Sequence, residues 1–136
     1  MNKVPKNKVS YSESIKVTLK YIDTLNHVNN LVYLKWVLEI SGKHWNLLAP
    51  LEIKEQNIWI VLRHEIDYLA PAFLDDTLNI YTWVGETAGV RSVRYVDIYR
   101  DDILLAKCKT TWVMADPKTL RPKRIGEEVL AILIKN

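Results

Sequence analysis

The stretch YIDTLNHVNNLVYLKWVLEI, residues 21–40, carries the strongest structural signal in the chain. Four polar side chains fall within eight residues near its start, and they are Asp23, His27, Asn29 and Asn30. An almost wholly apolar run follows from Leu31. We interpret this junction as the beginning of a helix whose entrance is polar.

The apolar run predicts a long helix over residues 31–48. Apolar side chains recur there at helical spacing, at Leu34, Val37, Leu38, Trp45 and Leu48. One polar stripe runs beside them, formed by Lys35, Glu39, Lys43 and Asn46. Further apolar side chains lie off the main face, at Trp36, Ile40 and Leu47. Because such a helix is apolar over most of its circumference, we expect it to be covered on several sides.

Five other segments have the character of β-strands, and turn-forming residues separate the last four. The predicted strands are residues 11–20, 58–69, 77–87, 90–100 and 103–115. In the first, Ile15, Val17 and Leu19 would share one face. Residues 127–134 are expected to form a short helix or coil. The order of strand, long helix and four antiparallel strands indicates an α+β fold with one sheet and one dominant helix.

The composition is that of one globular domain over residues 1–136, with 49% hydrophobic and 26% charged residues and a net charge of +3. Four glycines argue against a glycine-rich phosphate loop. The lone cysteine, Cys108, cannot form an internal disulfide, and no segment has the pattern of a signal peptide or membrane span. We expect a cytoplasmic protein that binds neither membranes nor nucleic acid.

A single sheet that curls around one helix leaves two edge strands. Edge strands expose unpaired backbone groups, which natural proteins usually pair or cover. We therefore expect a homodimer, or a homotetramer made of two dimers.

The polar junction has two explanations. In the simpler one, Asn29 or Asn30 caps the helix, while Asp23 and His27 are ordinary loop residues. In the other, the junction is reactive. A helix N-terminus stabilises an oxygen that becomes negative, and a carboxylate beside it can act as a base or a nucleophile. That combination suits acyl transfer, with the apolar helix lining a slot for an acyl chain.

The junction also resembles the signature of the hotdog-fold thioesterases, a superfamily that includes 4-hydroxybenzoyl-CoA thioesterase and the acyl carrier protein (ACP) thioesterases of plants and bacteria. The matching positions are Asp23, His27, Val28, Asn29, Asn30 and Tyr33. The WVLE of residues 36–39 is similar to the acyl-ACP branch. Residues 68–82 resemble the family's Tyr-x-x-Pro strand end and the loop after it. Residues 90–125 resemble its last hairpin.

The resemblance implies a hotdog fold, in which a five-stranded antiparallel sheet wraps around one long central helix. It also implies a dimer with its site at the subunit interface, and hydrolysis of an acyl-CoA or acyl-ACP thioester to free acid and thiol. Asp23 matches the catalytic carboxylate, which acts as a nucleophile or as a base for water. The backbone N–H near Asn30 matches the group that polarises the thioester carbonyl, and His27 matches a residue of the catalytic set.

Substrate contacts follow from the same resemblance. Asn29, Tyr33 and Tyr68 match positions near the substrate, and Arg91 falls where some relatives bind the phosphates of CoA. Between residues 91 and 124 there are nine Lys or Arg and four Asp. We interpret most of these cations as solvent-facing, although a few could bind CoA phosphates or the acidic surface of a carrier protein.

The chain departs from the family at four positions. A Gly often precedes the family's His, where this chain has Asn26. The acyl-ACP branch has an Asn two residues after the catalytic Asp, where this chain has Leu25. Its acidic and Cys positions fall near Leu69 and Ala70. The full acyl-ACP catalytic set is therefore absent, and the expected mechanism rests on the carboxylate and imidazole of the junction.

Other reactive side chains have simpler explanations. Cys108 lies on the apolar face of its strand and is expected in the core. Glu39 shares the polar stripe of the helix with lysines and is a minor candidate for the catalyst. His44 and His64 have no partner at ligand spacing, so we expect no metal and no cofactor.

Two alternatives to thioester hydrolysis stay open at this point. A hydratase or dehydratase on the same fold would act on an enoyl chain. A non-catalytic module would bind acyl-CoA or ACP without cleaving it. The acyl length, an aromatic or aliphatic preference, and the choice between CoA and ACP do not follow from the sequence.

Overall fold

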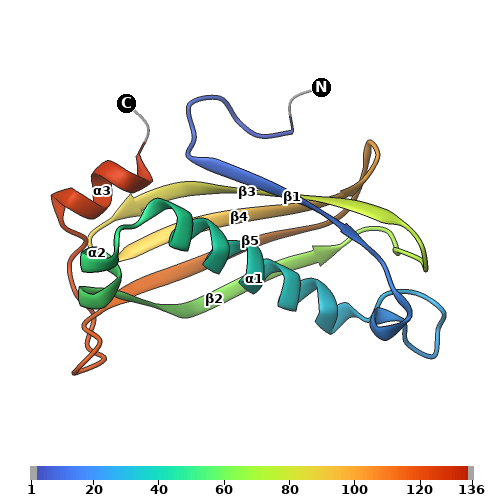
Figure 1. Ribbon diagram of the computed structural model, residues 1–136, viewed down its shortest axis with the longest axis horizontal. Coiled ribbons are helices and arrows are strands. Elements are labelled where there is room, and N and C mark those ends of the chain that lie inside the picture. The colour runs from blue at the N-terminus through green and yellow to red at the C-terminus, as the bar shows by residue number, and fades with distance from the viewer. Residues whose placement is uncertain (1–2, 135–136) are drawn as a thin grey trace.

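A computed structural model, which describes residues 3–134, shows a long helix lying across one face of a twisted sheet (Figure 1). The strands are β1 (Ser10–Lys16), β2 (Ile58–Tyr68), β3 (Thr77–Ala88), β4 (Arg91–Arg100) and β5 (Ile103–Ala115). The helices are α1 (Asn30–Leu48), α2 (Leu51–Gln56) and α3 (Glu127–Leu133), with a 3-10 turn η1 (Leu19–Tyr21) after β1. None of the helices in residues 3–134 is long and apolar enough to cross a membrane.

The five strands form one antiparallel sheet in the order β1-β3-β4-β5-β2. The predicted α+β architecture, with five antiparallel strands around one long helix, is confirmed. Side chains alternate between the two faces, as strand geometry requires, so that Val96 and Ile98 of β4 and Ala106 and Cys108 of β5 are buried under α1. β1 and β2 are the edges of the sheet.

Helix α1 begins where the sequence predicts. The Asn29 side chain accepts a hydrogen bond from the Leu31 amide (2.9 Å), which satisfies one of the free N–H groups of the first turn. The helix ends at Leu48, just before Pro50, whose ring disfavours helical backbone in the preceding residue. Of the two candidate caps, Asn29 and Asn30, it is therefore Asn29 that caps the helix.

The buried face of α1 differs from the predicted one. Its buried residues are Tyr33, Trp36, Val37, Ile40, Ser41 and His44. Leu38, expected on the core face, is exposed, and Leu31, two turns earlier on the same side of the helix, is 74% exposed. Leu47 is 69% exposed near the C-terminal end of the helix. The side of α1 that carries Leu31 and Leu38 therefore faces outward in the single chain.

One local prediction is also wrong. The first strand ends at Lys16 and the chain turns through η1, so Leu19 is exposed instead of sharing the buried face of Val17. After Pro50 the chain forms the short helix α2. Figure 1 shows α2 and α3 together at one end of the sheet, while the entrance loop of α1 lies at the other end.

Candidate active site

A tight loop leads into α1. An isolated bridge pairs Ile22 with Val28, the Asp23 amide donates to the His27 carbonyl (3.0 Å), and the Asn26 amide donates to the Asp23 carbonyl (3.1 Å). Asn26 has a φ of 64°, in the left-handed region that Gly and Asn adopt most readily. The loop therefore needs a residue that tolerates this conformation where the family often has Gly, and Asn meets that need.

Asp23 is a half-buried residue of this loop. Its Oδ1 accepts from the Leu25 amide (2.8 Å), the bond of an Asx turn. Its Oδ2 has no hydrogen-bond partner among residues 3–134. One carboxylate oxygen thus fixes the loop and the other is available.

A pocket of about 260 Å³ opens at the N-terminal end of α1. Its lining residues are His27, Val28, Asn30, Tyr33, Tyr68, Leu69, Ala70 and Pro71. The carbonyl of Asn29 accepts from the Val32 amide and its side chain from the Leu31 amide, whereas the Asn30 amide has no acceptor among residues 3–134. An N–H at the positive end of the helix dipole is therefore left for a ligand in this pocket.

Two tyrosines form a wall of the pocket. The Tyr68 hydroxyl donates to the Asn30 carbonyl (3.1 Å), and the rings of Tyr33 and Tyr68 meet edge to face at 5.6 Å. Burial raises the pKa of both phenols above the ordinary value, so both stay protonated at neutral pH. They are neutral hydrogen-bonding groups in an otherwise apolar wall.

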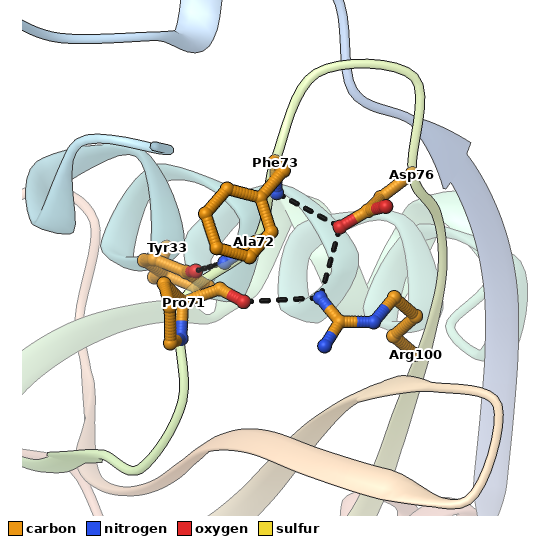
Figure 2. A network of polar contacts seen from close by, with 6 residues as sticks. All are labelled: Tyr33, Pro71, Ala72, Phe73, Asp76 and Arg100. Atoms are coloured by element: carbon orange, nitrogen blue, oxygen red, sulfur yellow. Dashed lines mark hydrogen bonds and ion pairs between the residues drawn. The ribbon is translucent and has the colours of Figure 1, made fainter. Parts of the chain in front are cut away.

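The loop between β2 and β3 is fixed against the helix, as Figure 2 shows. The Tyr33 hydroxyl accepts from the Ala72 amide (3.1 Å). Arg100 donates from one nitrogen both to the Pro71 carbonyl (3.0 Å) and to the Asp76 carboxylate (2.9 Å). These bonds join β4, the loop and α1. They therefore hold in place the side of the pocket that the loop residues Ala70 and Pro71 form.

The structure brings four of the predicted site residues together: His27, Asn30, Tyr33 and Tyr68 all line the pocket. Asp23 does not line it, although it lies in the same loop as His27, and their backbones are hydrogen-bonded.

Arg91 is not near this pocket within one chain. It pairs with Val113 of β5, whereas Tyr68 pairs with Ala106 of the same strand. The two positions on β5 are 113 − 106 = 7 residues apart, or roughly 23 Å along a strand. Arg91 therefore lies at the opposite end of the sheet from the helix entrance.

The other reactive side chains lie elsewhere. Cys108 is buried as predicted, and burial raises the pKa of its thiol. Glu39 is exposed, 3.8 Å from the Lys35 ammonium. Arg94, interpreted from the sequence as solvent-facing, is only 7% exposed and contacts buried His44. The sequence signal that could have shown that Arg94 is buried is its position two residues before Val96, on the inward side of an alternating strand.

Comparison with known proteins identifies the family and the fold. The family model of the acyl-ACP thioesterase N-terminal domain matches residues 8–133. The fold is similar to that of YbaW, a probable thioesterase from Escherichia coli, at a TM-score of 0.78 and 24% identity over 91% of this chain and 98% of that one. No curated protein sequence matches the chain.

Two further solved structures are similar. One is Slr0204, a 1,4-dihydroxy-2-naphthoyl-CoA thioesterase from Synechocystis, with a TM-score of 0.76 and 16% identity over 90% of this chain and 94% of that one. The other is the 12:0-ACP thioesterase from Umbellularia californica, with a TM-score of 0.81 and 17% identity over 94% of this chain. This chain covers 52% of that protein, about half its length.

The sheet order, the central helix and these structural matches define a hotdog fold. With the family match, the class of protein is a hotdog-fold thioester hydrolase, which confirms the predicted enzyme class. The chain belongs to the acyl-ACP thioesterase family, matched by the model of its N-terminal domain over nearly its whole length.

Proposed function

We propose that the pocket at the entrance of α1 is the active site and that it hydrolyses an acyl-CoA or acyl-ACP thioester to free acid and thiol. The observation that carries the proposal is that the backbone N–H of Asn30 is free. It has no acceptor among residues 3–134, it lies at the electropositive end of a 19-residue helix, and Asn30 lines the pocket. A thioester carbonyl seated there gains stabilisation as its oxygen becomes negative.

The carboxylate of Asp23 supplies the second half of the chemistry. It either attacks the carbonyl carbon or takes a proton from a water molecule that attacks it. The tetrahedral oxyanion then collapses, the carbon–sulfur bond breaks, and the leaving thiolate receives a proton through His27. When water attacks, this collapse gives the free acid directly. When Asp23 attacks, it leaves an acyl anhydride on the carboxylate, which a water molecule then hydrolyses to the free acid and the regenerated Asp23. Because Asp23 does not line the pocket while His27 does, the carboxylate would meet the reacting carbon at the mouth of the pocket.

We propose a homodimer formed by the edge strand β2. Leu62 and Ile60 of this strand are exposed apolar residues, and the outer edge of β2 has no neighbouring strand among residues 3–134. A twofold antiparallel pairing of β2 with β2 of a second copy would cover both features. A homotetramer would require two such dimers to associate.

The twofold pairing would also give Arg91 a role. In an antiparallel pair centred on the middle of β2, the Ile58 end of one strand lies opposite the Tyr68 end of the other. Arg91 is at the Ile58 end of the sheet, since its partner Val113 pairs with Ile60. Arg91 of a second copy would then lie on the side of the helix entrance, where CoA phosphates could reach it.

The carrier stays open between CoA and ACP. The name of Slr0204 gives an aromatic acyl-CoA as its substrate, and that of the Umbellularia protein gives 12:0-ACP. Both substrate classes are therefore proposals for this chain. The cytoplasmic location expected from the sequence stays a prediction.

The test is thiol release from a panel of short, medium, long and aromatic acyl-CoA esters, and from matching acyl-ACPs. We expect release from at least one ester with saturation kinetics. Consumption of crotonyl-CoA without free thiol would favour a hydratase instead. Saturable binding without thiol release across the panel would favour a non-catalytic module.

A further inference from the structure

A larger cavity, of about 350 Å³, lies at the opposite end of α1 from the proposed active site. It is enclosed by the C-terminal half of α1, by α2 and α3, and by the ends of β2, β4 and β5 that meet there. We call it the Arg94 cavity and define it by Ser41, Gly42, Trp45, Trp59, Arg94 and Trp112. It shares no lining residue with the pocket at the helix entrance.

Arg94 is a buried cation without a counter-charge. One guanidinium nitrogen, Nη1, donates to His44 Nδ1 (2.7 Å) and to the Thr82 hydroxyl (3.0 Å), and both acceptors are neutral. No carboxylate within residues 3–134 forms an ion pair with it. Burial lowers its pKa to about 10, which still leaves it charged at neutral pH.

The rest of the guanidinium is free to bind a ligand. The Nε and Nη2 atoms of Arg94 have no hydrogen-bond partner among residues 3–134. Neither atom is fully buried, so both can be reached from outside the protein core. Because Arg94 is 7% exposed and lines the cavity, we infer that these N–H groups face it. A guanidinium edge with free donors is the geometry that binds a carboxylate by two parallel bonds.

The surroundings favour an organic anion. Lys54 adds a second cation, and no lining residue is acidic. Three tryptophans line the cavity, Trp45, Trp59 and Trp112, and the rings of Trp45 and Trp59 lie edge to face at 5.6 Å. A cation with free donors thus lies beside large apolar rings in a space of ligand size.

We propose that the Arg94 cavity binds an apolar organic acid, with its carboxylate on the Arg94 guanidinium and its hydrocarbon or aromatic body against the tryptophans. This site is distinct from the proposed thioester site. From Asn30 to Ser41 the helix rises through 41 − 30 = 11 residues, or roughly 17 Å. The inference goes beyond thioester hydrolysis and does not depend on it.

The direct test uses octanoate and 3-phenylpropanoate, with octanamide and 3-phenylpropanamide as neutral analogues of the same shape. Binding to the full chain is followed by calorimetry and by tryptophan fluorescence, since three tryptophans line the cavity. We expect saturable binding of the acids at neutral pH and binding of the amides at least about tenfold weaker, since the ion-paired hydrogen bonds are lost. Equal affinity for acid and amide would overturn the proposal.

Variants locate the site. Arg94→Met should weaken octanoate binding by at least about tenfold, whereas Asp23→Asn, at the other end of the helix, should leave it unchanged. A change of octanoate affinity in either direction in Asp23→Asn would place the acid in the thioester pocket and overturn the proposal.

A second variant keeps the test independent of how Arg94→Met folds. A Cβ atom added at Gly42 meets no atom within 4 Å, and Gly42 lines the cavity, so a leucine side chain there should extend into the mouth of the cavity instead of into the core. We expect it to abolish octanoate binding, while Gly42→Ala, which adds one methyl group, retains binding. Wild-type affinity in Gly42→Leu would overturn the proposal.

Discussion

His44 Nδ1 lies 2.7 Å from Arg94 Nη1 beneath the C-terminal half of α1. An arginine only donates, so Nδ1 is the acceptor and the imidazole is neutral, with its proton on Nε2. His44 is 3% exposed, and the Tyr11 ring stacks on it at 5.5 Å. Burial first, and the charge of Arg94 second, lower the pKa of His44 to about 4.

Stability should therefore fall as the pH drops below 6.5. The imidazole of the unfolded chain has a pKa near 6.5, so the unfolded state takes up the proton first. The contribution is complete above pH 6.5 and is lost as the pH falls towards 4. We expect a loss of roughly 3 kcal/mol in the free energy of unfolding across this window, measured by urea denaturation.

The control for this prediction is His44→Gln, because a glutamine carbonyl can still accept from Arg94 but does not titrate. This part of the pH dependence should disappear in the variant, while that of other groups, such as His64, remains. Parallel loss of stability in the wild type and His44→Gln would show that another group is responsible.

The elements with strong patterns could be predicted from the sequence. The last strand was expected over residues 103–115 and is found there, and α1 begins one residue before its expected start. Long alternation and the Asn29 cap define these segments locally. The buried face of α1 could not be predicted from the sequence. Apolar residues surround the helix, and their spacing alone does not say which side meets the sheet.

The site was predicted in part for a similar reason. The motif placed His27 and Asn30 together, and they line one pocket. The bond between the Asp23 carboxylate and the Leu25 amide depends on the path of the loop, which the motif does not specify. The contact of Arg94 with His44 joins residues 50 positions apart, so no local pattern contains it.

Asp23→Asn should lower the turnover of the best thioester by about 10²–10⁴. An asparagine keeps an oxygen that can accept from the Leu25 amide, so the loop should hold its shape while the negative charge is lost. Thiol release and circular dichroism measure the two effects. Glu39→Gln, which neutralises an exposed carboxylate on α1, should keep wild-type turnover. Equal turnover in Asp23→Asn and the wild type would remove Asp23 from the mechanism.

Asn29→Ala should destabilise the protein by about 1 kcal/mol, because the Leu31 amide loses its acceptor. Asn29→Asp should retain the stability, since a carboxylate accepts the same bond and interacts favourably with the helix dipole. Urea denaturation compares the three proteins. If the alanine and aspartate variants were equally stable, the cap would not contribute as the geometry indicates.

Two glycines should respond in opposite directions to replacement by alanine. At Gly42, inside α1 and in open space, alanine should stabilise the protein by about 0.5–1 kcal/mol. At Gly85, a Cβ atom would lie 2.5 Å from the ring of Tyr95, which is stacked on Trp83 and cannot easily move. We expect Gly85→Ala to cost about 1–3 kcal/mol. Thermal unfolding measures both, and a stabilised Gly85→Ala would contradict the packing described.

Leu62→Lys should convert the proposed dimer to a monomer. Leu62 is 53% exposed on the edge strand β2, and a lysine there would place one charge from each copy near the twofold axis of the β2 pair. Leu19→Lys is the matched control, since Leu19 is 73% exposed but lies in η1, after the opposite edge strand. Sedimentation at micromolar concentration should show a dimer, or a tetramer of two dimers, for the wild type and Leu19→Lys, and a monomer for Leu62→Lys. A monomeric wild type would refute the proposed assembly and, with it, the role given to Arg91 of a second copy.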